Sequence, residues 1–148
     1  MKHTWILVAD STRARYFTAS TPSSALQEFE DDIHPASRQH ERNMTSDLPG
    51  KARGAGGAGG HAYEESTDPK EYEASEFAKE IARHLEESLN AGKYGQLLIV
   101  AAPSFLGDLR SQISERVKKL ICFELDKNLA THTAEDIRKH LPEFLPNR

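Results

Sequence analysis

The sequence predicts an α/β domain built on a mixed five-stranded sheet. Two uninterrupted apolar runs, residues 5–9 and 96–102, are typical of strands buried on both faces. The first 33 residues also hold three strand-like segments with short connections, which favours an antiparallel meander. Helix-like and strand-like segments then alternate along the rest of the chain, so we expect helices to cover the sheet.

The three N-terminal strand segments differ in pattern. Residues 5–9 are continuously apolar, and Asp10, Ser11 and Thr12 then favour a turn. Residues 14–19 are rich in strand formers. Residues 26–33 alternate only in part between apolar and polar side chains, so the third strand is the least marked of the three.

A long helix is predicted to begin at Asp68. Asp68 suits the N-cap, Pro69 suits the first helical position and Glu71 completes a capping box. Gly92 provides a C-terminal stop. Apolar residues recur at helical spacing over about five turns, and they form one stripe of Ala74, Phe77, Ala78, Ile81, Leu85 and Leu89.

The rest of the chain predicts two more helices around a further strand. Pro103 ends the buried run 96–102, and Ser104 is expected to cap one helix that carries an apolar face as far as Leu120. Residues 121–125 then predict a strand. Thr133 opens a last helix with a capping-box-like pattern, which Pro142 breaks or ends.

Composition is that of a single globular domain spanning residues 1–148. The net charge of −4 argues against a generally basic nucleic-acid-binding domain, so a surface that binds polyanions must be local. Cys122 is the one cysteine, which excludes an intrachain disulfide and indicates a reducing compartment; we expect it to be a small buried strand residue. No apolar stretch has the length of a signal or a membrane span, so we expect a cytoplasmic protein with no membrane partner.

Residues 35–67 form a predicted loop that is glycine-rich and basic. Six of the nine glycines lie here, and a loop of this length is usually functional or disordered. Glycines let the backbone approach a ligand and expose N–H groups to anions, while Lys51 and Arg53 add charge suited to phosphates. The Gly-Lys-Ser/Thr ending of a P-loop is missing. The loop therefore predicts contact with RNA or a nucleotide phosphate, and the alternative is a flexible, unstructured segment.

Four separated motifs resemble the bacterial host-attachment family, whose usual label is "protein required for attachment to host cells". They are Trp5-Ile-Leu-Val-Ala-Asp-Ser-Thr-Arg-Ala-Arg-Tyr-Phe17, Gly59-Gly-His-Ala-Tyr-Glu-Glu-Ser-Thr-Asp-Pro69, Ala101-Ala-Pro-Ser-Phe-Leu-Gly107 and Glu124-Leu-Asp-Lys127. The resemblance covers nearly the whole chain.

That family is in turn remotely similar to the middle domain of archaeal and eukaryotic peptide-chain release factors. This similarity implies a ribonuclease-H-like or ribosomal-protein-like α/β fold. Release factors carry a basic Gly-Gly-Gln loop after the third strand and before the long helix. Gly59 and Gly60 match this motif, but His61 stands in place of glutamine. The departure argues against peptidyl-tRNA hydrolysis and leaves docking on the ribosome or on structured RNA as the implied role.

The candidate site residues fall into two groups. Asp10, Asp126 and Lys127 are cleft candidates at strand ends, although Asp10 is better explained as a turn former because the central strand ends without an acid. The candidates for binding RNA or phosphate are Lys51, Arg53, Gly54, Gly56, Gly57, Gly59, Gly60, His61, Arg13 and Arg15. For Arg13 and Arg15 the alternative is a solvated hairpin edge.

No metal site, catalytic residue or cofactor is predicted. The seven histidines form neither a Cys/His pair nor an HExxH motif, and we expect them to be unrelated surface residues, although His34, His40 and His61 could meet around the loop.

Three functions follow from these patterns. The first is a noncatalytic module that binds the ribosome or structured RNA through the loop. The second is a factor that promotes attachment to host cells, directly or indirectly. The third is a hydrolase acting on a nucleotide or nucleic acid, with His61 as general base. The oligomeric state, monomer or homo-oligomer, stays open.

Overall fold

The computed structural model describes residues 3–34 and 69–146. Its elements follow the predicted order of three strands, a long helix and then alternating strands and helices. They are β1 (Thr4–Ala9), β2 (Arg13–Thr18), β3 (Gln27–Ile33), α4 (Pro69–Asn90), β4 (Gln96–Ala101), α5 (Pro103–Gln112), α6 (Glu115–Lys118), β5 (Ile121–Leu125) and α7 (Ala134–Lys139).

The strands form one mixed sheet in the order β3-β2-β1-β4-β5. β2 pairs antiparallel with both β1 and β3, which confirms the N-terminal meander. β4 lies parallel to β1 on one side and to β5 on the other, which confirms that the second apolar run is parallel to the first. In the register of the sheet, Ile6 of β1 lies between Phe17 of β2 and Leu98 of β4.

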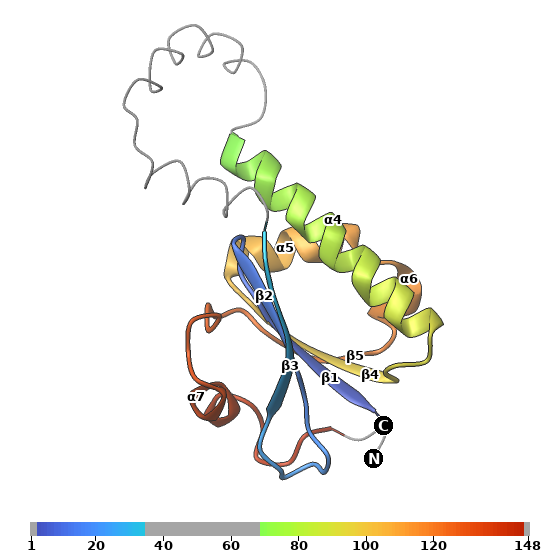
Figure 1. Ribbon diagram of the computed structural model, residues 1–148, viewed down its shortest axis with the longest axis vertical. Helices are drawn as coiled ribbons and strands as arrows, with labels where there is room; N and C mark the ends of the chain where they lie inside the picture. The colour runs from blue at the N-terminus through green and yellow to red at the C-terminus, as the bar shows by residue number, and fades with distance from the viewer. Residues whose placement is uncertain (1–2, 35–68, 147–148) are drawn as a thin grey trace, which may run out of the picture.

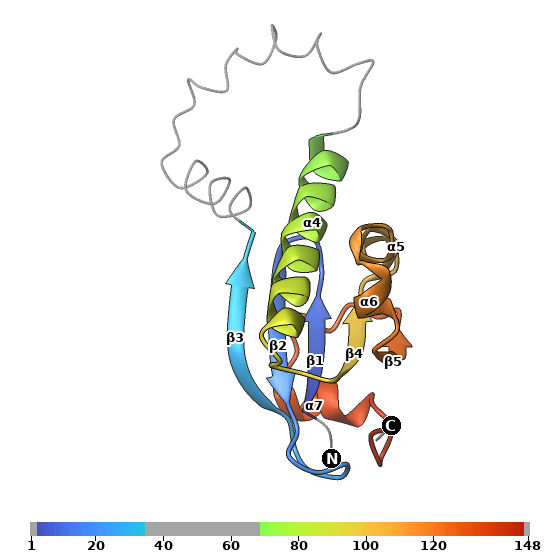
Figure 2. The same ribbon diagram turned by 90° about the vertical axis from the view of Figure 1, so that its right-hand side faces the viewer.

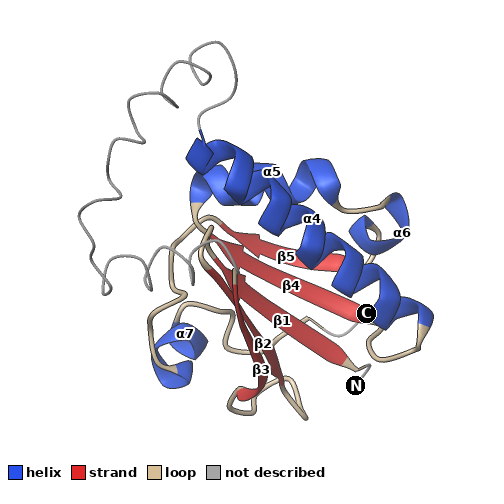
Figure 3. Cartoon of the chain, turned by 45° about the horizontal axis from the view of Figure 1, so that its top comes forward, coloured by secondary structure: helices blue, strands red, loops and turns tan. Residues whose placement is uncertain are grey.

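Two hydrophobic cores lie on opposite faces of the sheet. Helices α4, α5 and α6 cover one face, and α7 covers part of the other (Figures 1 and 3). Because successive strand residues point to opposite faces, β1 contributes Trp5 and Leu7 to the first core and Ile6 and Val8 to the second. All residues of β1 and β4 are buried, as continuous apolar runs predict.

Helix α4 crosses the sheet face and ends at a left-handed glycine. Gly92 has φ +74°, and the bonds from Gly92 N to Leu89 O and from Lys93 N to Ser88 O, both 2.9 Å, form a Schellman C-cap. The predicted apolar stripe is confirmed, with Phe77 and Leu85 fully buried. None of the helices in the described part, α4 included, is long and apolar enough to cross a membrane.

The region after β4 differs from the single predicted helix. α5 begins at Pro103 with Ala102 at its N-cap position, so the expectation that Ser104 caps this helix is wrong. The chain then breaks at Ile113, which is extended, and Ser114 caps α6 by accepting a bond from Val117 N at 3.2 Å. The Ser114 hydroxyl also donates to Glu86 of α4 at 2.6 Å, so contact with another helix helps to hold the break.

The two ends of the fold meet at the amino end of the central strands. The Gln96 amide donates to Thr4 Oγ1 at 3.0 Å and to the backbone oxygen of Pro146. Gly95 N also donates to His3 O at 2.8 Å. A side chain from the middle of the chain therefore ties its first strand to its last described residue.

Candidate functional site

One edge of the sheet gathers the ends of four strands. β1, β4 and β5 are parallel, and β3 runs in the same direction because two antiparallel pairings separate it from β1. The end of β3 and the start of α4 flank the predicted loop in the sequence, and both lie toward this carboxyl edge (Figure 1). Ligands of open α/β sheets commonly bind at such an edge.

The loop candidates themselves fall beyond the described residues. They stay predictions from the sequence, and they are Lys51, Arg53, Gly54, Gly56, Gly57, Gly59, Gly60 and His61. The remaining five candidates, Arg13, Arg15, Asp10, Asp126 and Lys127, lie within the described part.

Asp10 shapes the turn between β1 and β2. Its Oδ1 accepts hydrogen bonds from Thr12 N at 2.8 Å, from Thr12 Oγ1 at 2.8 Å and from Arg13 N at 3.0 Å. These contacts make an Asx-type turn, which confirms the prediction that Asp10 is a turn former.

Arg13 lies at the carboxyl edge and forms an exposed ion pair. Its Nη2 lies 2.8 Å from Asp31 Oδ2 of β3, and the two side chains are 32% and 41% exposed. A pair with this exposure is worth little to stability. Arg13 is therefore a basic candidate that stays close to solvent at this edge.

Arg15 is a clamp between the sheet and the chain before α7. Its guanidinium bonds Glu28 through Nε at 3.1 Å and Nη2 at 2.8 Å, and Nη1 donates to the backbone oxygens of Ala130 and His132 at 3.0 and 2.6 Å. The guanidinium carbon also lies 5.1 Å from the centre of the Phe17 ring. The hydrogen bond with Glu28 raises the pKa of Arg15. The side chain is only 12% exposed, so neither a solvated hairpin edge nor an open phosphate contact describes it well.

Asp126 and Lys127 lie just beyond β5 and are exposed. They line neither the hollow at the amino end of β1 nor those beside α7 and along β5. Glu124, two residues earlier, pairs with Arg110 of α5. Across the part of the chain that the structure describes, no group of three or more histidine, cysteine or acidic side chains is placed to hold a metal ion.

Two of the histidines differ from the expected surface role. His34 is 5% exposed and stacks on Phe77 with ring centres 4.8 Å apart. Neither of its ring nitrogens has a hydrogen-bond partner among the described residues. His84 packs against Tyr16, with ring centres 5.0 Å apart, and its Nε2 lies 3.3 Å from Glu30. The sequence feature that could have distinguished His34 from the other histidines is its position directly after the third strand.

A second histidine arrangement lies at α7. His132 Nδ1 contacts the Asp136 carboxylate, and His140 Nδ1 lies 3.0 Å from the Asp136 backbone oxygen. The hydrogen bond with His132 lowers the pKa of Asp136, and the positive charges of His132, His140 and Lys139 act in the same direction. A shallow hollow of about 480 Å³ opens beside His132 and Asp136.

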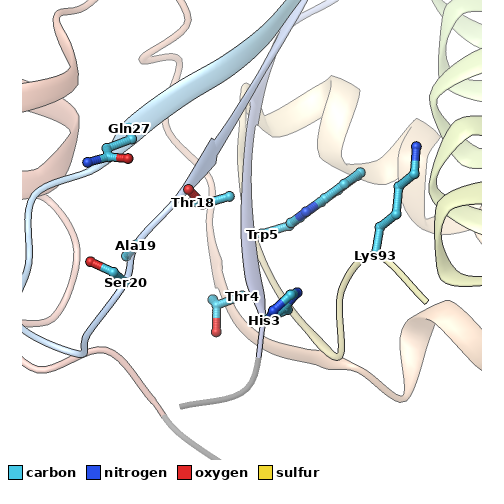
Figure 4. A pocket seen from close by; sticks show the side chains of 8 residues that line it. All are labelled: His3, Thr4, Trp5, Thr18, Ala19, Ser20, Gln27 and Lys93. Carbon is cyan, nitrogen blue, oxygen red and sulfur yellow. The ribbon is translucent and has the colours of Figure 1, made fainter. Parts of the chain in front are cut away.

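A hollow of about 410 Å³ opens at the opposite, amino end of β1 (Figure 4). Trp5 forms part of its wall and stacks on Tyr94 with ring centres 4.8 Å apart. No motif predicted this hollow, because its lining comes from four separated segments. Its lining residues are His3, Thr4, Trp5, Thr18, Ala19, Ser20, Gln27 and Lys93.

Comparison with known proteins gives two matches. The family described as "Protein required for attachment to host cells" matches residues 5–141 of this chain. An uncharacterized protein of Rickettsia prowazekii (strain Madrid E) is 32% identical over 82 residues, which are 54% of this chain and 55% of that protein. The match thus spans about half the length of this curated relative.

Proposed function

Because the chain belongs to the family of proteins required for attachment to host cells, we propose that it promotes such attachment by binding a partner. The observation that carries the proposal is the family match over residues 5–141, which takes in almost the whole described fold. The carboxyl edge of the sheet supports a binding role, since β3 ends and α4 begins toward it, and these two elements flank the glycine-rich basic segment in the sequence. Whether the effect on attachment is direct or indirect is part of the test.

A gene deletion and complementation experiment tests this proposal. Bacteria without the protein should attach poorly to host cells, and the wild-type chain should restore attachment. Complementation with the Lys51→Ala/Arg53→Ala variant should restore it only in part. The matched control is Arg83→Ala/Lys119→Ala, two exposed cations elsewhere on the described fold, which should restore attachment fully. Unchanged attachment after deletion would contradict the proposal.

Cell fractionation separates a direct from an indirect effect. Protein found at the bacterial surface would support direct contact with the host. Protein confined to the cytoplasm, together with an attachment defect, would support an indirect effect.

A second candidate function is binding to the ribosome or to structured RNA. The observation that favours it is the position of the basic glycine-rich segment, between the third strand and the long helix, as in the release factors that the sequence resembles. Backbone N–H groups in a glycine-rich segment, together with Lys51 and Arg53, suit phosphate contacts. This function is compatible with the first if the effect on attachment is indirect.

Salt-dependent binding tests the second candidate. Purified protein should bind ribosomes or structured RNA with an affinity that falls as salt rises, because released counterions drive phosphate contacts. Lys51→Ala/Arg53→Ala should weaken binding and lower the salt slope by about two, one for each cation. The Arg83→Ala/Lys119→Ala control should change neither the affinity nor the salt slope. Binding that is absent, or independent of salt, would rule the candidate out.

A further inference from the structure

The hollow at the amino end of β1, called the amino-end hollow below, has the size of a small-molecule site. Its volume of about 410 Å³ lies within the range that such sites occupy. Figure 2 shows β1 beginning and α4 ending toward one end of the fold, whereas β3 ends and α4 begins toward the other. The amino-end hollow is therefore separate from the edge on which the proposed function rests, and it can be tested independently.

One wall of the amino-end hollow is a row of side chains on a single face of the sheet. Trp5 of β1 pairs with Thr18 of β2, and Thr18 pairs with Gln27 of β3. Residues directly opposite one another in antiparallel strands point to the same face, so these three side chains form a continuous row. Thr18 is half-buried and Gln27 is exposed, so the polar end of the row is open to solvent.

The connection from α4 to β4 holds the backbone of Lys93 beside this row. Lys93 N donates to Ser88 O at 2.9 Å, and the Tyr94 hydroxyl donates to a backbone oxygen of α4 at 2.7 Å. Gly95 N donates to His3 O at 2.8 Å, which joins the connection to the chain before β1. The ammonium of Lys93 and the imidazole of His3 are thus brought to the same hollow by backbone contacts, and a preorganised site loses less entropy when it binds a ligand.

The lining of the amino-end hollow contains no carboxylate. The chain as a whole has 23 acidic residues against 19 lysines and arginines, so an acid-free lining is a local departure from its composition. Farther along β3, Glu28 pairs with Arg15, and Glu30 lies 3.3 Å from His84. Within residues 3–34 and 69–146, Lys93 has no carboxylate partner, so its ammonium is available to an anion.

The hollows beside α7 and along β5 are lined differently. The one beside α7 includes Glu135 and Asp136, and the one along β5, of about 490 Å³, includes Glu124. Cys122, expected to be a small buried residue, is partly exposed and lines the hollow along β5. Because a carboxylate in the lining repels an anion, the amino-end hollow suits an anionic ligand better than these two.

The neutral part of the lining indicates what the anionic group is attached to. Thr18, Ser20 and Gln27 offer hydroxyl and amide groups, which both donate and accept hydrogen bonds, as the hydroxyls of a sugar do. Trp5 is only 5% exposed, and the Tyr94 ring stacks on it, so the indole has no free face for a nucleobase. These features favour a hydroxylated anion over a nucleotide.

We propose that the amino-end hollow binds a hydroxylated organic anion of sugar size, a sugar acid or a sugar phosphate. The anionic group lies at Lys93, with His3 as a further donor. The hydroxyls face Ser20 and Gln27, which Figure 4 shows on the other side of β1 from Lys93, with Thr18 between them. Carboxylates and phosphates share this recognition, because an ammonium binds both as a point charge.

Tryptophan fluorescence of the full chain tests binding, because Trp5 is the single tryptophan and lines the hollow. Glucuronate and glucose 6-phosphate are the anionic probes, and glucose is the neutral one. At least one anionic probe should give a saturable change with an affinity about tenfold above that of glucose, because a neutral sugar lacks the charge-assisted bond. Tighter binding of glucuronate identifies the ligand as a sugar acid, and tighter binding of glucose 6-phosphate identifies a sugar phosphate. Calorimetry measures the same affinities without the fluorophore.

Substitutions locate the binding. Lys93→Gln should raise the dissociation constant of the tighter anionic probe by about tenfold and leave that of glucose unchanged. Thr18→Val, which removes one hydroxyl at nearly constant shape, should weaken binding of both the anionic probe and glucose. The matched control is Lys119→Gln, the same change at an exposed lysine outside the hollow, and it should leave every affinity unchanged.

Three outcomes would overturn the proposal. They are no saturable binding of either anionic probe by fluorescence and calorimetry, binding of glucose as tight as that of the anions, and anion binding that Lys93→Gln leaves unchanged. None of these outcomes bears on the proposed function, since the variants change no residue of the glycine-rich segment.

Discussion

At the residue scale, Arg15 is a side chain whose role depends on distant parts of the sequence. Its two backbone acceptors, Ala130 and His132, lie 115 and 117 residues further along the chain. The composition of residues 14–19 predicted a strand there but contained no information on these partners. The sequence therefore predicted an exposed basic residue at a position where the folded chain has a side chain that joins β3 to the segment before α7.

Replacing Arg15 by alanine should destabilise the fold by roughly 2–4 kcal/mol, since several hydrogen bonds to a charged group are lost together and Glu28 keeps its charge without a partner. Arg15→Lys should recover only part of this, because an ammonium cannot reproduce the fork of contacts. Urea unfolding measures both. Arg13→Ala is the control: its exposed pair predicts a loss of less than about 1 kcal/mol. Equal losses of stability in Arg15→Ala and Arg13→Ala would contradict the structural role of Arg15.

The lowered pKa of Asp136 predicts that the stability of the fold falls at acidic pH. Its pKa lies below the ordinary value of 3.8, because of the hydrogen bond with His132. The ionised carboxylate therefore contributes stability that is complete above about pH 4 and is lost as the pH falls through the lower, folded pKa. The stability difference between wild type and Asp136→Asn should shrink over this range. Thermal unfolding at a series of pH values measures it.

His132→Gln provides the check on that cause. It should remove most of the same pH-dependent difference, and adding Asp136→Asn to it should change little more. A full acid-dependent difference that persists in the His132→Gln background would show that another group lowers the pKa of Asp136.

At the element scale, local sequence predicted where most elements begin and end, and tertiary contacts account for the exceptions. Thr133 caps α7 as predicted, with its hydroxyl accepting from Asp136 N at 3.1 Å. The break between α5 and α6 was not predicted, because Ile113 and Val117 continue the apolar spacing of one helix across it. Ser114 bonds both Val117 N and Glu86 of α4, and the second contact cannot be read from local spacing.

Replacing glycine by alanine should have opposite effects on stability at Gly92 and at Gly107. Gly92→Ala should destabilise by about 1–2 kcal/mol, since φ +74° is unfavourable for any residue with a Cβ. Gly107→Ala, in the interior of α5, should stabilise by roughly 0.5–1 kcal/mol because alanine is the better helix former. A Cβ added at either position meets no atom within 4 Å, so the difference is conformational rather than steric. Denaturant midpoints measure it, and a shift of the same sign in both variants would contradict this explanation.

At the scale of the whole molecule, two apolar runs carried most of the prediction of the fold. Residues 5–9 and 96–102 lie side by side as β1 and β4 at the middle of the sheet. The two strands are parallel because β3 already runs in the direction of β1 and helix α4 crosses back from β3 to β4. The hollow at the amino end was not predictable, because residues as far apart as His3 and Lys93 meet only after the sheet forms. The glycine-rich candidates were found by composition alone, and their chemistry stays a prediction.

The gradient of burial across the sheet predicts a gradient of local stability. Amide hydrogens of β1 and β4 should exchange most slowly, since both strands are buried throughout and paired on both sides. Those of β3, an exposed edge strand, should exchange faster by orders of magnitude. Hydrogen–deuterium exchange resolved by mass spectrometry measures the difference. Equal protection of β3 and β1 would indicate that something covers the β3 edge.

The contacts of Gln96 with Thr4 and Pro146 bring the two ends of the described fold together. The order in which the segments are joined along the chain can therefore be changed without changing the fold. Because neighbouring residues Gly95 and Gln96 bond His3 and Pro146 respectively, a short linker could join His3 and Pro146 into a closed backbone. New ends could then be opened between His34 and Pro69, where no described strand or helix would be cut. We expect this circular permutant to keep the native circular dichroism spectrum. Residues 35–68 would then be two independent tails, and comparing its binding with that of the native chain would show whether the segment acts through its sequence or through being held at both ends.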